Sequence, residues 1–494
     1  MKYKNIIISL ALIFAFGCYS CDNWLDVKPD DKVSEEEVFS SIEGFRNALN
    51  AIYIEMNAAD LYGKSLGSEL VEVMGQRYNV NTEWTEMTSV MEFRYKSSSV
   101  IRRFEGVWTS AYALISNINH ILKNCEERRE VLVGDNYNLI KGEALALRAY
   151  LHFDLFRLFG PVYSSDTTAV SLPFYPEFSF TANELLPGHE FLQLVIADLE
   201  TAGKLLEVDP IIQKGPSWSE DMYDQNRNRV SRMNYYAVQL LRARVELYAG
   251  HKKQALAAAV KVIGVQEDYF PFTPASDVSA GTDNPDRLFS SELVFALENP
   301  QRATIYNSLF NPENVKLENL LLVRQNKLDA LFTEDRDYRY KAWFPQEKTV
   351  GGVACRVFHK LADVANVDLK FNILLPMLRV SEAYYIAAEC EENPAEGLKY
   401  LNSVLNNRGL ESEKKEELLQ DYLTLEYRRE FFGEGQLFFY YKRLNEERIP
   451  DAVSDWENEV RMTKTEYVVP LPESEIKYRD MTNQDKVRGT ERSV

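Results

Sequence analysis

Histidine and cysteine are scarce in this chain. Of its 494 residues, five are histidine and five are cysteine. The histidines are dispersed, and the three cysteines that follow the N-terminal pair have neither the spacing of a zinc site nor the density of a disulfide framework. The sequence also contains no HExxH and no glycine-rich phosphate loop, and no CxxC pair follows the N-terminal cysteines. We therefore expect no metal centre and no cofactor.

Positive charge is also in short supply. Lysine and arginine number 56 against 75 aspartates and glutamates, which gives a formal net charge of −19 at pH 7. Proteins that bind nucleic acid gain most of their affinity from a basic face that neutralises phosphates. The acidic balance argues against a nucleic-acid partner and against an extended electrostatic contact with a membrane surface.

Long hydrophobic runs are missing as well. The apolar run at residues 6–16 follows two lysines and has about eleven residues, whereas a spanning helix needs about 20. It is followed by small residues and the cysteines Cys18 and Cys21, which is the layout of a lipoprotein signal. We predict a signal peptide at residues 1–20 and a palmitate-type lipid anchor on Cys21. Cys18 is the alternative acylation site, and an ordinary secreted protein is the alternative interpretation.

Helical periodicity dominates the rest of the chain. Ser34-Glu35-Glu36-Glu37 has the form of a capping box and opens a helix expected to reach about Met56. The stretch 138–159 is apolar nearly all round, which predicts a helix buried on most sides. The apolar spacing predicts further helices over residues 99–125, 191–206, 231–249, 252–263, 378–390, 394–406 and, in pieces, 413–448.

Two pairs of these helices are joined by short turns, 231–249 with 252–263 and 378–390 with 394–406. Helix, short turn and helix, with alanines at the crossing, is typical of tetratricopeptide-like repeats. Residues 266–376 differ, because prolines and glycines mark loops there and residues 292–297 and 353–361 have the composition of short strands. Residues 208–229 are expected to form a long loop.

Charged and polar residues inside the buried-looking helix need partners. Glu143 and Arg148 are expected to belong to a structural network of ion pairs, and His152 to be a hydrogen-bonded core residue. The chain has 75 aspartates and glutamates, so their number alone does not exclude a pair of carboxylates that hydrolyses glycosides. Nothing in the sequence identifies such a pair.

Aromatic residues in loops are the best candidates for ligand contact. Sugars and peptides bind on exposed aromatic faces that have polar side chains beside them. Three segments fit this description, and each could instead be a loop plug packed on the body. The candidate ligand-binding residues in them are Tyr78, Asn81, Trp84, Trp218, Tyr223 and Tyr306.

Several ordered motifs run over nearly the whole chain. They are 21–29, 37–39, 48–53, 142–153 (Gly142-Glu143-Ala144-Leu145-Ala146-Leu147-Arg148-Ala149-Tyr150-Leu151-His152-Phe153), 158–162, 378–384, 428–431 and 470–476, followed by Asn483-Gln484. Together they resemble the SusD/RagB family of outer-membrane nutrient-binding lipoproteins of Bacteroidota, whose mature start would lie at Cys21. The chain departs from the family in the C-terminal helix block, with Tyr427 and Leu437 where an arginine is usual and Tyr440 where an aspartate is usual, and the family's Asn-Pro-Gly-Tyr type ending is missing after Gln484.

The resemblance implies a mainly α fold, in which a tetratricopeptide-like helical-repeat body carries a loop-rich subdomain with a few short strands. It divides the chain into a signal peptide (1–20), an N-terminal helical region (21–265), a loop-rich ligand-side subdomain (266–376) and a C-terminal helical region (377–494). It implies no catalytic residues, and it transfers no binding residues because the ligand loops vary within the family.

The resemblance also implies a function. The protein would sit on the outer face of the outer membrane, capture a glycan and deliver it to a SusC-like TonB-dependent outer-membrane transporter. Two alternatives are open at this point. One is a peptide-binding import lipoprotein of the same architecture, and the other is a surface glycosidase.

Overall fold

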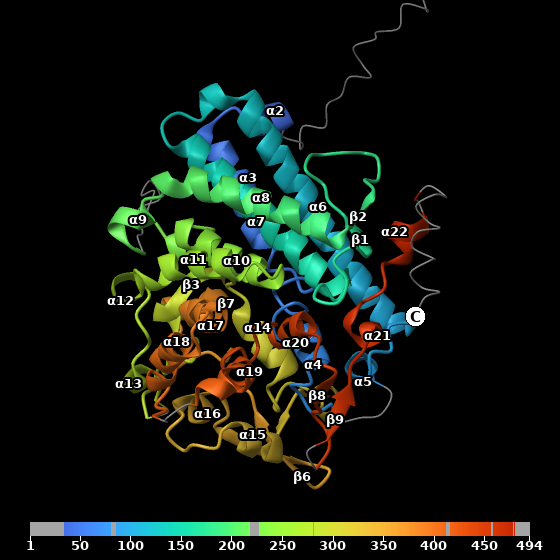
Figure 1. Cartoon of the computed structure of the whole chain (residues 1–494), viewed down its shortest axis with the longest axis vertical. Coiled ribbons are helices and arrows are strands. Elements are labelled where there is room, and N and C mark those ends of the chain that lie inside the picture. The colour runs from blue at the N-terminus through green and yellow to red at the C-terminus, as the bar shows by residue number, and fades with distance from the viewer. Residues whose placement is uncertain are drawn as a thin grey trace, which may run out of the picture.

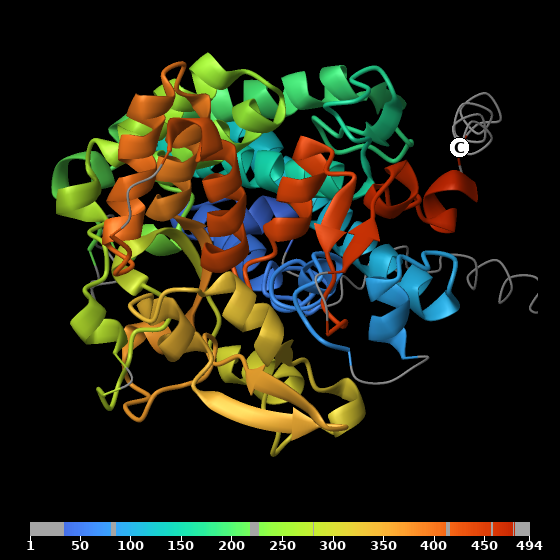
Figure 2. The same cartoon turned by 60° about the horizontal axis from the view of Figure 1, so that its bottom comes forward.

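The structure, a computed structural model, describes residues 34–80, 85–217, 227–279, 281–411, 415–455, 458–477 and 479. Helices make up most of it, and the N-terminal ones form layers in the upper half of Figure 1. The short strands are spread over the molecule, and Figure 2 brings those of the lower end forward. None of the helices in the described part of the chain combines the length and the apolar character that a bilayer crossing requires.

A central helix organises the N-terminal half. Helix α7 (Asn136–Phe159) packs between α6 (Ser98–Glu127) and α8 (Gly188–Leu205), and α3 (Ile42–Glu55) lies against α6 and α7. Nearly every residue of α7 is buried, as its apolar composition predicts. The helices predicted at 99–125, 138–159 and 191–206 are confirmed with ends shifted by a few residues.

The helix predicted over residues 34–56 is two helices. Helix α2 (Glu35–Val38) ends at a turn, and Ser41 begins α3 by accepting a hydrogen bond from the amide of Gly44 at 3.2 Å. Gly44 allows this turn, because a Cβ at that position would lie 1.6 Å from the carbonyl oxygen of Val38. Ser34 caps α2 through the amide of Glu37, as the capping box predicts.

The two predicted helix pairs are confirmed. The first consists of α10 (Tyr235–Tyr248) and α11 (Lys252–Ile263), and the second of α17 (Val380–Cys390) and α18 (Pro394–Asn406). Helices α10 and α11 pack on each other, and α11 packs on α17, so the two pairs stack although more than 100 residues separate them in the sequence. Asn234 caps the N-terminus of α10, and Asn393 caps the N-terminus of α18.

The region between the pairs contains most of the strands. Strand β3 (Leu293–Glu298) pairs antiparallel with β7 (Leu374–Arg379), and β6 (Val353–Val357) lies between β4 (Val323–Arg324) and β5 (Gln346–Val350). Strands β3 and β6 confirm the two predicted strands. Three helices connect these strands, α14 (Arg302–Leu309), α15 (Gln325–Leu331) and α16 (Tyr338–Trp343).

Shorter elements complete the fold. Two small hairpins are formed by β1 (Val170–Pro173) with β2 (Leu185–Pro187) and by β8 (Arg448–Pro450) with β9 (Glu459–Arg461). The C-terminal helices α19 (Leu419–Glu430) and α20 (Leu437–Leu444) are separate, as the sequence indicates. The remaining helices are α4 (Leu70–Met74), α5 (Glu86–Met91), α9 (Ile211–Lys214), α12 (Gln266–Tyr269), α13 (Ala275–Val278), α21 (Lys464–Tyr467) and α22 (Glu473–Lys477).

Buried charges are joined in networks. Glu143 pairs with Arg229 at 2.6 Å, and Arg148 pairs with Asp198 at 2.7 Å. All four side chains are buried, which confirms the predicted structural role of Glu143 and Arg148. A larger network centres on Glu430, which receives hydrogen bonds from three arginines on three different segments, Arg339, Arg379 and Arg408. Two of these arginines also pair with Glu292, which ties the strand region to the C-terminal helices.

The three described cysteines, Cys125, Cys355 and Cys390, are all buried and free. Burial raises the pKa of the thiols of Cys125 and Cys390 to about 12, so both are protonated at neutral pH. They behave as core residues, as the apolar surroundings of Cys390 predict.

Candidate functional site

Helix α14 carries the predicted ligand residue Tyr306. Asn299 lies just before the helix, and its side-chain oxygen accepts a hydrogen bond from the amide of Gln301, the N-cap residue, at 2.8 Å. Arg302, in the first turn, is buried, and its guanidinium donates to the carbonyl of Phe371 at 3.0 Å and pairs with Asp363 at 3.2 Å. These contacts fix α14 on the body and leave Tyr306, one turn further on, half-buried at the surface.

Tyr306 lies beside His359. The two ring centroids are 5.3 Å apart with the planes inclined at 53°, and the tyrosine hydroxyl is 3.5 Å from Nε2 of His359. The same Nε2 is 3.2 Å from the side-chain oxygen of Gln346, the first residue of β5. The backbone amide of His359 donates to the carbonyl of Trp343 at 2.8 Å, which holds the residue in place after β6.

Arg287 completes the group. Its carbonyl oxygen accepts a hydrogen bond from the indole N–H of Trp343 at 2.8 Å, so Trp343 links the backbones of Arg287 and His359. The guanidinium is close enough to act electrostatically on both Tyr306 and His359. We call Arg287, Tyr306, Gln346 and His359 the Tyr306 cluster.

The charge state of the Tyr306 cluster follows from burial. Burial, with a contribution from the Arg287 cation, lowers the pKa of His359 to about 4. Burial raises the pKa of Tyr306, although Arg287 opposes that shift. At neutral pH the cluster therefore presents a neutral phenol, a neutral imidazole, an amide and one cation.

Chemically, this arrangement suits binding rather than bond cleavage. A tyrosine ring offers an apolar face, and the phenol, imidazole and amide offer hydrogen-bond donors and acceptors for hydroxyl groups. Asp363, the nearby acid, is already paired with Arg302. The cluster itself contains no carboxylate, whereas glycoside hydrolysis generally uses two.

Known proteins are similar to this chain in sequence. A SusD-like family model, described as "Starch-binding associating with outer membrane", matches residues 23–215. Two SusD-like proteins of Formosa agariphila, P38 and P25, are 28% identical over 213 residues and 22% identical over 319 residues. These matches cover 42% and 60% of this chain. They span 39% and 52% of the relatives, so the chain spans about half or less of their length.

Solved structures extend the similarity to the whole fold. A SusD superfamily protein from Bacteroides thetaiotaomicron superposes with a TM-score of 0.72 at 21% identity, covering 89% of this chain and 98% of that one. Surface glycan-binding protein A of the same species, solved in complex with laminarihexaose, superposes with a TM-score of 0.65 at 18% identity, covering 89% and 98%. Residues 23–215 are similar to SusD-like proteins in sequence, and the fold is that of solved SusD superfamily proteins.

The SusD-like assignment confirms the predicted fold class. The chain has the mainly α architecture of the SusD superfamily, with a tetratricopeptide-like helical body formed by the stacked helix pairs. The family is one of starch- and glycan-binding proteins associated with the outer membrane. These comparisons do not test the predicted boundaries between the three regions of the chain, at residues 265/266 and 376/377.

In this SusD-like fold Tyr78 is a core residue. Its side chain has no exposed surface, and its ring packs against Phe310 at 5.5 Å and Phe358 at 6.5 Å. Tyr78 therefore takes the alternative role of a plug, because it is fully buried and packs against aromatic rings from two other segments. Both rings are close to the Tyr306 cluster in the sequence, since Phe310 directly follows α14 and Phe358 directly precedes His359.

The other predicted residues, Asn81, Trp84, Trp218, Tyr223 and the anchor Cys21, lie outside the described residues. The described helices nearest to the two aromatic segments are α5, after residue 84, and α9, before residue 218. In Figure 1 they lie on opposite sides of the molecule, α5 at the lower right and α9 at the upper left. A ligand role for these residues remains a prediction.

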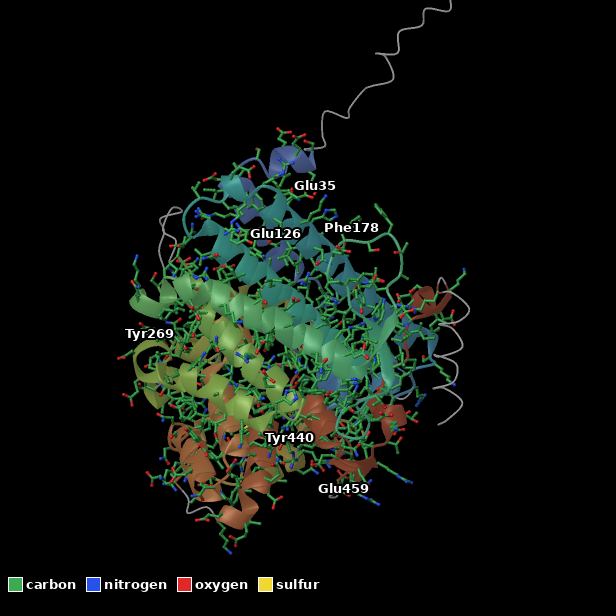
Figure 3. The ribbon with its side chains drawn as sticks, turned by 45° about the horizontal axis from the view of Figure 1, so that its top comes forward. Glu35, Glu126, Phe178, Tyr269, Tyr440 and Glu459 are labelled. Atoms are coloured by element: carbon green, nitrogen blue, oxygen red, sulfur yellow. The ribbon has the colours of Figure 1, made fainter. Side chains whose placement is uncertain are left out.

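The sequence did not point to Arg287, Gln346 or His359. They are up to 72 positions apart (359 − 287). Three contacts bring them together, the bond from the Trp343 indole to the carbonyl of Arg287, the backbone bond from His359 to Trp343, and the side-chain contact between Gln346 and His359. It also missed a second exposed aromatic group between β1 and β2, where Phe178 lies over the ring of His120 at 4.4 Å and Phe180 is 96% exposed. Figure 3 shows Phe178 at the edge of the helical body.

Proposed function

We propose that this protein is a cell-surface lipoprotein that captures a glycan and delivers it to a SusC-like TonB-dependent outer-membrane transporter. The observation that carries the proposal is the SusD-like sequence and fold, to which the lipoprotein signal and the Tyr306 cluster add independent support. A solved protein of the same fold holds laminarihexaose, a glucan oligosaccharide.

The Tyr306 cluster is the binding site within this proposal. A half-buried tyrosine loses little conformational entropy when a sugar ring covers it, because the protein already fixes its ring beside His359. The amide of Gln346 and the imidazole of His359 lie next to Tyr306 in the cluster, where they can form hydrogen bonds with the hydroxyls of the same sugar. The protein binds and releases its ligand without cleaving it.

Glycan binding can be tested directly. Calorimetry or affinity electrophoresis against a panel of oligosaccharides should show binding of at least one glycan class by the native protein. Tyr306→Ala should weaken that binding by about tenfold or more, because the stacking face is lost. Tyr400→Ala is the matched control. Tyr400 is a partly buried tyrosine of α18 that packs on Tyr384 of α17 and does not belong to the Tyr306 cluster.

Two results would contradict the assignment. Binding of peptides with no binding of any glycan would favour the peptide-importing alternative. Hydrolysis of a bound oligosaccharide, detected as new reducing ends and lost on substitution of an acid pair, would make the protein a glycosidase.

The membrane attachment and the transporter need their own experiment. We expect the mature protein to begin with an acylated Cys21, which mass spectrometry of the N-terminal peptide would identify. Cys21→Ala should release the protein from the membrane fraction, and Cys18→Ala should leave it there. Purification of the native protein in detergent should bring down an outer-membrane barrel, and recovery of soluble partners alone would argue against delivery to a transporter.

A further inference from the structure

A groove between helices α8 and α10 forms a cavity on the helical body, apart from the Tyr306 cluster. Its volume is about 210 Å³. Residues of α8, of the turn that follows it, of α10 and of α11 line this cavity, which we call the α8–α10 groove. None of the lining residues belongs to the Tyr306 cluster. Figure 1 shows α8 above α10 and α11, with α14, which carries Tyr306, below them.

The lining residues occupy the facing sides of two helices. Those of α8 and the following turn are spaced at i, i+3, i+4 and i+7, beginning at Glu200, and those of α10 at i, i+4 and i+7, beginning at Tyr235. Glu200 pairs with Arg242 at 2.7 Å, and Gly203, one turn after Glu200, faces Gln239, one turn before Arg242. The two helices therefore run antiparallel, and the groove extends from the ion pair at one end toward Tyr235 at the other.

A glycine leaves the middle of the groove open. Gly203 presents no side chain, and a Cβ there would lie 3.2 Å from Nε2 of Gln239. Gln239 is only 3% exposed, and neither atom of its side-chain amide has a hydrogen-bond partner in the part of the chain that the structure describes. The oxygen is fully enclosed, whereas the nitrogen faces the gap over Gly203. This nitrogen is therefore the donor that the floor of the groove offers to a ligand, and a ligand that accepts its hydrogen bond removes the cost of leaving it unpaired.

Tyr235 supplies an aromatic wall that the protein holds in place. Its backbone amide donates to the carboxylate of Asp209 at 3.0 Å, and its ring lies edge-on to that of Tyr236, with centroids 5.3 Å apart and planes inclined at 82°. The side chain is half-buried and lines the groove. A tyrosine ring fixed in this way offers a sugar an apolar face at little cost in conformational entropy.

The charges that line the groove have both signs. Arg242 is neutralised by Glu200. Lys204, Lys261 and Glu207 also line the groove, and none of them pairs with another of the described residues. An anionic ligand would be repelled by the two glutamates, and a cationic ligand by the lysines and the arginine. A neutral hydroxyl group avoids both repulsions, because it accepts a hydrogen bond from an ammonium or amide and donates one to a carboxylate.

We propose that the α8–α10 groove is a second saccharide-binding site, which holds one neutral sugar ring against Tyr235 and within reach of the amide of Gln239. The inference goes beyond the proposed function, because it assigns binding to a different face of the molecule and uses no residue of the Tyr306 cluster. A chain with two such sites can hold a long glycan at two points, which strengthens binding without any new contact at either site.

The experiment uses small sugars that differ in charge. Ligand-observed NMR and calorimetry with the full mature chain carrying Tyr306→Ala would test glucose, galactose and mannose, each beside its uronate and its 2-amino sugar. We expect at least one neutral hexose to bind with a Kd of about 1 mM, as a ligand of this size in an open groove allows. Its uronate and its amino sugar should bind at least about threefold more weakly. Tighter binding of either charged form would overturn the assignment of a neutral ligand.

Variants that close the groove then locate the binding. Gly203→Ala, added to Tyr306→Ala, should weaken hexose binding by about fivefold or more, because the new Cβ covers the amide of Gln239. The variant should fold, since alanine favours a helix more than glycine does and the Cβ meets only the end of a flexible side chain. Tyr235→Ala should weaken binding as well, because the stacking face is lost. Thr201→Ala is the control, since Thr201 is exposed on the same helix and does not line the groove.

The outcomes separate this inference from the proposed function. Hexose binding that neither Gly203→Ala nor Tyr235→Ala weakens overturns the inference and leaves glycan capture at the Tyr306 cluster intact. Hexose binding that Tyr306→Ala alone abolishes also overturns it, because the cluster then accounts for all of the binding. Binding that Gly203→Ala weakens and Tyr306→Ala does not supports the groove and contradicts the role of the cluster. Failure of every hexose to bind overturns the inference, whereas the proposed function is judged by the oligosaccharide panel.

Discussion

His152 shows how a single polar residue is accommodated in the centre of the helical body. Its side chain has no exposed surface. Nδ1 lies 3.0 Å from the carbonyl of Arg148, and Nε2 accepts a hydrogen bond from the amide of Tyr175 at 3.3 Å. Its ring is stacked on Phe174 at 4.1 Å. Burial, together with the Arg148 cation, lowers the pKa of His152 to about 3.

This pKa makes stability depend on pH. The unfolded state binds a proton near pH 6.5 and the folded state does not, so stability is fully present above about pH 6.5 and falls as the pH drops. Below about pH 6 the loss approaches 1.4 kcal/mol per pH unit for His152 alone, and His359 adds a loss of the same sign. Urea denaturation at several pH values between 5 and 7 measures it.

His152→Gln should flatten that dependence. The variant is less stable at pH 7, because glutamine does not reproduce both hydrogen bonds and the ring stack, but its stability should fall less between about pH 6.5 and pH 5. His189→Gln is the control, since His189 is partly exposed, with 41% of its side chain accessible. An unchanged slope in His152→Gln would show that His152 is protonated in the folded state.

Two residues that depart from the usual family pattern contact each other. Tyr427 and Tyr440, which stand where an arginine and an aspartate are usual, stack with their centroids 4.0 Å apart and their planes inclined at 20°. Tyr440 is also reached by the hydroxyl of Thr424 and the amide of Gln420. An aromatic pair thus joins α19 to α20, and the departure affects packing between these helices rather than the Tyr306 cluster.

At the scale of elements, the periodicity of apolar residues was sufficient to predict a helix wherever one face of that helix is buried. It predicts α6, α7, α10, α11, α17 and α18 because one apolar stripe, or an all-round apolar surface, determines each of them. It fails at residues 39–41, where the apolar spacing continues across a turn that depends on the absence of a side chain at Gly44. It also predicts no pairing partner for β3, because β7 lies 76 positions further along (374 − 298).

The turn between α19 and α20 depends on glycine in the same way. Gly435 has φ +66°, and a Cβ there would lie 2.0 Å from the carbonyl oxygen of Leu66. Its amide and that of Gly433 each donate to the carboxylate of Glu72 at 2.9 Å. The turn therefore fixes α20 against α4 through both a close approach and two charge-assisted hydrogen bonds.

Gly435→Ala should destabilise the protein strongly. We expect a loss of about 3–5 kcal/mol, from the left-handed backbone strain and from the displacement of Leu66. Chemical denaturation measures it, and hydrogen exchange should show lost protection in α4 and α20. Gly351→Ala is the control. It has φ +56° and open space around it, so it should cost about 1–2 kcal/mol of backbone strain alone.

At the scale of the whole molecule, contacts cross both predicted boundaries. Strand β7, at 374–379, straddles 376/377 and pairs with β3. Arg408 bridges Glu292 of the middle region and Glu430 of α19, and α7 contacts both α10 and α20. The sequence could indicate the composition of each region but not these contacts, because those that cross a boundary join residues far apart in the chain, such as Glu292 and Arg408, which are 116 positions apart.

The network around Glu430 predicts how the molecule unfolds. Burial alone would raise the pKa of Glu430, but Arg408 and Arg379 hold it well below its ordinary value, so it is charged in the folded protein. Glu430→Gln leaves the charges of Arg339, Arg379 and Arg408 incompletely balanced in the interior, which should cost about 3–5 kcal/mol. Because these arginines come from the middle region and the C-terminal region, both should be destabilised together.

Calorimetry and hydrogen exchange should therefore find one main unfolding transition, which Glu430→Gln shifts as a whole to lower temperature. Glu396→Gln serves as the control, because Glu396 pairs with Lys399 on the exposed face of α18 and such pairs contribute less than about 1 kcal/mol. Early loss of protection in residues 266–376, with the helix pairs still protected, would show instead that the strand region unfolds independently. In that case the ion network would connect two separate folding units, and the ligand cluster would belong to the less stable one.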